Sequence, residues 1–235
     1  MQDQHIASAF DRDLESVQAQ IMKMGGLVEN AIRQGANSLD ALDVDLAEEV
    51  RAGDKAIDAL EGLINEQAAR VIALRAPTAI DLRLILSVIK ISANLERIAD
   101  YAKNMAKRTA VLATMPPVGD STGAIRRMTR TVEAMLKDAL DAYIQRDEER
   151  AFDVISRDEE VDQMYNGLFR EFLTHMMEDQ SNIGPCMHLH FIAKNVERMG
   201  DHVTAIAEQT VYLITGNTPD EARPKADKTS VMLKA

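Results

Sequence analysis

Two copies of one sequence pattern occur within this chain, and they predict two copies of one structural unit. The segment Asn94–Leu112 (NLERIADYAKNMAKRTAVL) aligns with Asn195–Leu213 (NVERMGDHVTAIAEQTVYL). Both segments open with the pattern N-x-E-R-x-x-D, so the asparagine, glutamate, arginine and aspartate recur in register. The chain is therefore interpreted as two homologous halves.

The match between the halves continues upstream with a different offset. Asp54 and Asp58 correspond to Asp158 and Asp162, and Glu29 corresponds to Glu133. The change of offset predicts loops of different length near residues 75–78 and 182–185, because insertions and deletions are tolerated in loops.

A proline pair separates the halves. Pro116 and Pro117 cannot continue a helix, and a glycine follows at position 119. We therefore predict a first three-helix bundle over residues 1–114, a second over residues 118–216 and a flexible C-terminal tail over residues 217–235.

Apolar residues within each half are spaced by three and four, which is the spacing of one helix face. Two matching rows are Leu84, Val88, Ile91, Leu95 and Ile98, then Leu189, Ile192, Val196, Met199 and Val203. No stretch alternates as a half-buried strand does. Each half carries three such helical segments, and short loops join them most easily as antiparallel neighbours. The predicted fold is all-α, with six long helices in two tandem three-helix bundles.

Charge and composition exclude several classes of protein. Asp and Glu number 38 against 27 Lys and Arg, and the net charge of −11 repels a phosphate backbone, so we expect no nucleic-acid partner. The opening MQDQHIASAF lacks the basic flank and apolar stretch of a secretory signal, which favours the cytoplasm. No apolar stretch reaches the ~20 residues of a spanning helix, so we expect only peripheral contact with a membrane, through partners.

Pairs of carboxylates spaced by one helical turn recur in both halves. The eight residues are Asp54, Asp58, Glu96, Asp100, Asp158, Asp162, Glu197 and Asp201. Like charges four residues apart on a helix repel, unless a cation lies between them. Oxygen ligands of this kind favour Mg, Mn or Fe ions, in a divalent or trivalent state, and helical projection places them at the surface or in a shallow groove. The alternative is that the pairs are ordinary solvated faces, neutralised by Arg97 and Arg198.

No catalytic constellation accompanies these carboxylates, and we predict that the protein is not an enzyme. The sequence has no Gly-rich phosphate loop and no G-x-S-x-G motif. A ferritin-like carboxylate metalloprotein requires Glu-x-x-His pairs, and none of the five histidines has a glutamate three residues before it. A purely structural helical scaffold is the other alternative, although it does not explain the retained N-x-E-R-x-x-D pattern.

The blocks NLERIAD and NVERMGDHVTAIAEQTVYLITG resemble the PhoU family of phosphate-responsive regulators, and the resemblance extends from about Phe10 to Gly216. It implies two three-helix bundles, a homodimer or larger homo-oligomer, and metal ions bound in some members at the eight carboxylates given above. One departure is Ala99, where the second half has Gly200, and this weakens the expectation of metal in the first half.

The same resemblance implies a function in phosphate homeostasis. The protein would regulate the phosphate-starvation response negatively and modulate phosphate uptake. It would do so by contacting the ATPase subunit of a phosphate ABC transporter and a membrane sensor histidine kinase. We expect it to act by contact and without catalysis, and to bind no phosphate directly.

Overall fold

The computed structural model describes residues 2–219, 227 and 229, with side-chain positions from residue 12 onward. The described part contains six long helices and no strand, which confirms the predicted all-α fold of two tandem three-helix units. The helices are α1 (Gln2–Ala41), α2 (Val44–Arg75), α3 (Ala79–Leu112), α4 (Ser121–Gln145), α5 (Glu148–Glu178) and α6 (Ile183–Thr215), with a short 3-10 turn η1 (Gln180–Asn182) before α6. Much of the predicted tail, namely residues 220–226, 228 and 230–235, lies outside the described residues.

The turn between the first two helices of each half is built in the same way. Leu42 and Arg146 both adopt a positive φ, 51° and 54°, and each is followed by an aspartate that caps the next helix. Asp43 accepts a hydrogen bond from the backbone N of Leu46, and Asp147 accepts one from that of Arg150, both at 3.0 Å. These side chains satisfy amide groups that a helix start leaves without an intrahelical partner, so the sequence fixes the turn locally.

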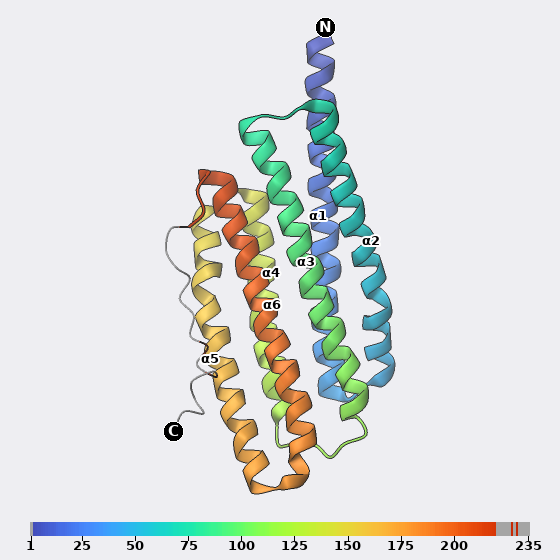
Figure 1. Ribbon diagram of the computed structural model, residues 1–235, viewed down its shortest axis with the longest axis vertical. Coiled ribbons are helices and arrows are strands. Elements are labelled where there is room, and N and C mark those ends of the chain that lie inside the picture. Colours follow the sequence, from blue (N-terminus) through green and yellow to red (C-terminus); the bar gives the residue numbers. More distant parts are fainter. Residues whose placement is uncertain (1, 220–226, 228, 230–235) are drawn as a thin grey trace.

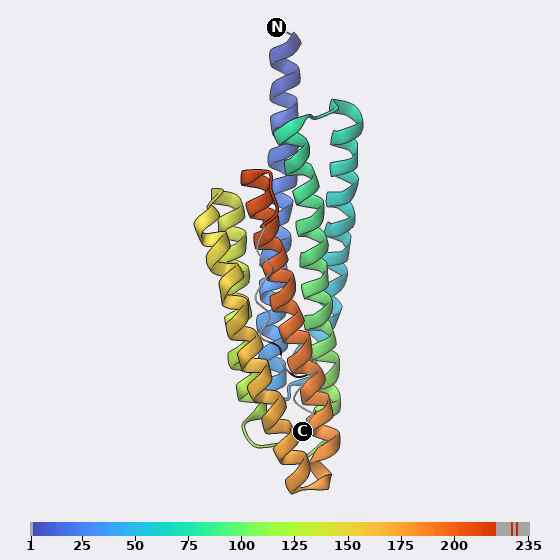
Figure 2. The same cartoon turned by 60° about the vertical axis from the view of Figure 1, so that its left-hand side comes forward.

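The two halves lie side by side along their lengths. Helix α3 packs against α6 and α1 packs against α4, while α2 and α5 lie on opposite outer sides (Figures 1 and 2). Each outer helix covers the central helix of its own half, α2 on α3 and α5 on α6. This arrangement matters for the site, because the predicted carboxylates lie on those two helix pairs.

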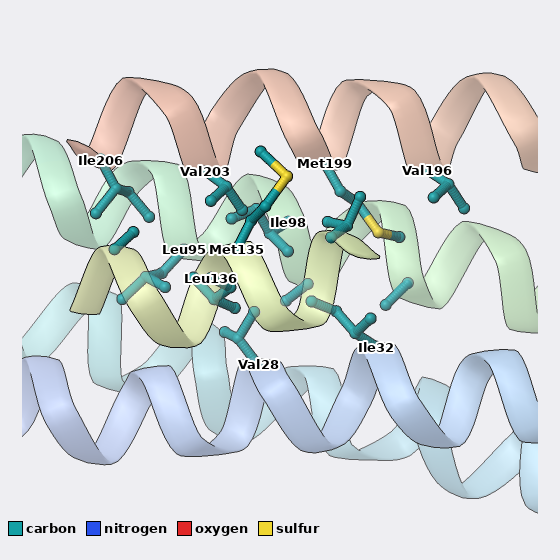
Figure 3. Packing of buried hydrophobic residues seen from close by; sticks show 14 of the residues in the cluster. Val28, Ile32, Leu95, Ile98, Met135, Leu136, Val196, Met199, Val203 and Ile206 are labelled. Carbon is teal, nitrogen blue, oxygen red and sulfur yellow. The ribbon is translucent and has the colours of Figure 1, made fainter. Parts of the chain in front are cut away.

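The main hydrophobic core spans both halves, and two small apolar clusters lie apart from it in the first half. Figure 3 shows side chains of α1, α3, α4 and α6 meeting between the helices, and the labelled ones are fully buried. They are Val28, Ile32, Leu95, Ile98, Met135, Leu136, Val196, Met199, Val203 and Ile206. Burial of apolar surface stabilises by about 25 cal/mol per Å². The contact between the halves is therefore part of the core that holds the fold together.

Hydropathy along the described helices was compared with that of membrane spans. None of the helices in the described part of the chain is both long enough and apolar enough to cross a bilayer.

Candidate carboxylate sites

The first cluster lies where α2 meets α3. Asp54 and Asp58 come from α2, and Glu96 and Asp100 from α3. Asp54 is only 5% exposed, and it accepts a hydrogen bond from the ammonium group of Lys103. The same Lys103 Nζ lies 3.4 Å from Oδ1 of Asp100, so this lysine joins the two helices through their carboxylates.

Burial and neighbouring charges shift the pKa values of two carboxylates in this cluster, Asp58 and Glu96. Partial burial raises the pKa of Asp58, and the charges of Asp54 and Asp100 raise it further, against the opposing effect of Lys103. Burial also raises the pKa of Glu96, and the charges of Asp100 and Asp58 add to it. Lys103 therefore links one member of each predicted pair, Asp54 and Asp100, while Asp58 and Glu96 lie near enough to feel the neighbouring negative charges.

The second cluster lies where α5 meets α6 and is more enclosed. Asp158, Asp162 and Glu197 are 3%, 4% and 6% exposed, and Asp201 is half-buried. The hydroxyl of Thr204 donates to Oδ1 of Asp158 at 3.3 Å. Three of the four carboxylates in this half are thus held in the interior, where an uncompensated negative charge is costly.

Glu197 has one paired and one unpaired oxygen. Its Oε1 accepts a 2.7 Å hydrogen bond from Lys194 Nζ, whereas Oε2 is buried without a hydrogen-bond partner among the described residues. Burial raises the pKa of Glu197; the Lys194 ammonium opposes this, and the charges of Asp201 and Asp227 add to it. An orphaned buried carboxylate oxygen is a position where a cation would relieve an electrostatic cost.

A residue beyond α6 completes the second cluster. The backbone N of Asp227 donates to Oδ2 of Asp162 at 3.0 Å, and its side chain accepts from Lys194 Nζ at 2.9 Å. Asp227 could not be predicted from the sequence pattern, because nothing in the pattern connects it with α5. Lys103 and Lys194 were not predicted either, although each lies three residues from a predicted carboxylate and therefore on the same helix face.

The depth of the carboxylates differs from the sequence-based expectation of a surface or shallow groove. Asp54, Asp158, Asp162 and Glu197 are more than nine-tenths buried. Helical projection placed these side chains at the edge of a single helix seam, but a neighbouring helix covers that edge in each half. The expectation of a solvent-exposed position was wrong for these four residues.

The alanine and glycine that differ between the halves lie beside the clusters. A Cβ added at Gly200 would come within 3.3 Å of Val161 Cγ1 and 3.5 Å of Asp158 Oδ1. The glycine therefore allows α5 to approach α6 closely next to Asp158. Ala99 is accommodated in the first half and is 2% exposed.

Metal binding at the eight carboxylates stays a prediction. Within the described part of the chain, no three or more His, Cys, Asp or Glu side chains converge in an arrangement that could hold a metal ion. The donor set itself, all carboxylate oxygens, has the chemistry that Mg, Mn or Fe ions accept. In the arrangement observed, a lysine ammonium takes a place among the oxygens of each cluster.

Comparison with known proteins places this architecture in a family. The PhoU domain matches twice, over residues 21–109 and 125–210, which is once in each half. Two curated relatives are described as phosphate-specific transport system accessory protein PhoU homologs. The one from Caulobacter vibrioides (strain NA1000 / CB15N) is 44% identical, over 95% of this chain and 97% of the relative. The one from Rhizobium meliloti (strain 1021) is also 44% identical, over 99% and 98%.

Two crystal structures have the same fold. PhoU from Pseudomonas aeruginosa superposes with a TM-score of 0.85 at 37% identity, covering 88% of this chain and all of that one. The phosphate transport system regulatory protein PhoU from Streptococcus pneumoniae gives 0.83 at 28% identity, covering 90% of this chain. Sequence repeat, helix arrangement and relatives agree, and the chain belongs to the PhoU family.

Proposed function

We propose that this protein is a cytoplasmic regulatory adaptor of phosphate homeostasis. It restrains the phosphate-starvation response and modulates phosphate uptake by contacting the ATPase subunit of a phosphate ABC transporter and a membrane sensor histidine kinase. One observation carries the proposal: relatives named as accessory proteins of the phosphate-specific transport system match this chain over nearly its whole length.

The architecture supports action by contact. Six helices of 25 to 40 residues present long side faces, which are surfaces suited to docking on a partner's helices. Several large apolar side chains are exposed on these faces, including Phe152 (45%) and Phe191 (44%). Self-association as a homodimer or larger homo-oligomer is part of the proposal, because it would cover such residues.

The regulatory role can be tested in cells that lack the gene for this protein. We expect a phosphate-starvation reporter to be active at high phosphate in the deletion strain and repressed again when the gene is restored. The purified protein is expected to co-purify with the transporter ATPase subunit. A reporter that responds normally to phosphate in the deletion strain would contradict the adaptor role.

We also propose that the carboxylate clusters bind a divalent or trivalent cation such as Mg, Mn or Fe. The buried, unpaired Oε2 of Glu197 supports this, together with the burial and the neighbouring carboxylate charges that raise the pKa values of Asp58 and Glu96. A cation bound in each cluster would neutralise the carboxylates and join α2 to α3 and α5 to α6. It would stabilise the helix pairs without taking part in chemistry.

Elemental analysis and metal titration of the purified protein test the cation sites. A variant with Asp100→Ala and Asp201→Ala removes one ligand from each cluster, and a control with Glu66→Ala and Glu160→Ala removes two exposed carboxylates from α2 and α5. We expect metal binding in the wild type and the control and its loss in the first variant. Equal binding by all three proteins would place the metal elsewhere.

A further inference from the structure

We propose that Lys103 and Lys194 are internal cations that compete with a metal ion for the two carboxylate clusters. The inference rests on the cation binding proposed above, and it concerns how that binding is controlled. Lys103 Nζ contacts Asp54 and Asp100, and Lys194 Nζ contacts Glu197 and Asp227. In each cluster, one ammonium group therefore uses carboxylate oxygens that a metal ion would need as ligands.

Both lysines are held among the carboxylates by hydrogen bonds. Lys103 Nζ donates to Oδ2 of Asp54, whose side chain is 5% exposed, and lies 3.4 Å from Oδ1 of Asp100. Lys194 Nζ donates to Oε1 of Glu197 at 2.7 Å and to Oδ2 of Asp227 at 2.9 Å. A permanent positive charge beside several carboxylates supplies the neutralisation that a bound metal would otherwise provide.

The repeat shows that these lysines are not a by-product of the duplicated pattern. Lys103 corresponds to Thr204 in the second half, and Lys194 corresponds to Ala93 in the first. Lys103 follows Asp100 by three residues, whereas Lys194 precedes Glu197 by three. Each cluster thus has its own lysine, supplied from a different turn of the helix. What the two halves share is a cation among the carboxylates, although its position in the sequence differs.

Both lysine side chains are partly exposed, so their ammonium groups can move out of the clusters into solvent. The side chain of Lys103 is 40% exposed, and its flexible stem can carry the ammonium group into solvent while the carboxylates stay in place. Lys194 is 28% exposed, is bound by Asp227 as well as Glu197, and lies 4.9 Å from the ring centroid of Tyr165. The first cluster should therefore admit a metal ion more readily than the second.

The test is titration of the full-length, chelator-treated protein with Mn²⁺ alone. Lys103→Gln and Lys194→Gln remove the charge and keep a polar side chain of similar length, and Lys107→Gln is the control, because Lys107 is an exposed lysine on α3. We expect each cluster variant to bind Mn²⁺ about ten-fold more tightly than the wild type and the control. Adding Asp100→Ala or Asp201→Ala assigns the tighter site to one cluster.

Thermal unfolding gives a second readout. In metal-free buffer, Lys103→Gln should unfold at a lower temperature than the wild type, because the repulsion around Asp54 is no longer compensated. Addition of Mn²⁺ should raise the unfolding temperature of the variant back to that of the wild type. If the wild type binds Mn²⁺ as tightly as the lysine variants, the lysines do not compete with the metal, but the cation sites themselves are supported. If no protein binds Mn²⁺, both the competition and the proposed cation sites are contradicted. Binding by the lysine variants alone would support the competition.

Discussion

Asn94 on α3 and His202 on α6 form a 2.8 Å hydrogen bond between Oδ1 of the amide and Nδ1 of the ring, across the boundary between the two halves. The Asn94 amide nitrogen donates to the carbonyl of Lys90 at 2.8 Å, which turns the amide oxygen toward the histidine. His202 must then carry its proton on Nδ1 in order to donate. The ring also lies 5.7 Å from that of Tyr101, centroid to centroid.

Removing this link between the halves should weaken the fold. Asn94→Ala deletes the acceptor and leaves a half-buried donor on His202, so we expect a loss of about 1 kcal/mol in the free energy of unfolding. Urea denaturation measures it. Asn104→Ala, at an exposed position of the same helix, is the matched control and should change stability by less than about 0.5 kcal/mol. Equal effects of the two substitutions would contradict a role for the hydrogen bond.

The core that joins the halves makes a stronger prediction. Ile98 is fully buried between the helices (Figure 3), whereas Ile80 at the start of the same helix is 68% exposed. Truncation of a buried isoleucine to alanine removes apolar contacts and leaves a cavity, and it costs about 2–5 kcal/mol. We expect Ile98→Ala to lie in this range and Ile80→Ala to lie within about 0.5 kcal/mol of the wild type. A single unfolding transition in Ile98→Ala would show that both halves still unfold together.

A sequence repeat and a helical period predict some features of this fold and not others. The spacing of Leu95 and Ile98, with its counterpart around Val196 and Met199, was sufficient to predict the helices and the two three-helix units. It was not sufficient to predict that Asp54 is buried, because this burial depends on how α3 covers α2. Projection of one helix contains no information on its neighbours.

The partners of the carboxylates were missed for a related reason. Lys103 and Lys194 occupy non-equivalent positions of the repeat, so neither lysine is among the residues that the two halves share. Asp227 reaches Asp162 from beyond α6, and only the folded chain brings the two together.

Glu29 provides a test of stability against pH. Burial and the charge of Glu133, its counterpart in the second half, raise the pKa of Glu29. A carboxyl whose pKa is raised on folding binds protons more tightly in the folded state. Its ionisation therefore lowers stability as the pH rises from the ordinary pKa of an unfolded glutamate, about 4.3, through the raised folded value. At neutral pH the ionised Glu29 is unfavourable.

Glu29→Gln should accordingly be more stable than the wild type at pH 7, by a few tenths of a kcal/mol. The difference should shrink as the pH falls through the pKa of Glu29 in the folded protein, because the wild-type carboxyl then becomes neutral as well. Thermal unfolding at pH 7 and pH 4 measures both values, with Glu15→Gln, an exposed residue of α1, as the control. A larger advantage of Glu29→Gln at pH 4 than at pH 7 would reverse the sign and contradict the assignment.

Two glycines should respond to alanine in opposite directions. Gly216 ends α6 with φ = 84°, and its backbone N donates to the carbonyl of Tyr212 at 2.9 Å. Alanine there would adopt a left-handed conformation at a cost of about 1–2 kcal/mol, and its Cβ would lie 2.7 Å from Nη2 of Arg83.

Gly53 lies inside α2, where an added Cβ meets no described atom within 4 Å. Alanine at this position should stabilise by up to about 1 kcal/mol, because it favours the helix. Urea denaturation of both variants checks the signs, and a stabilising Gly216→Ala would show that the end of α6 does not need the glycine.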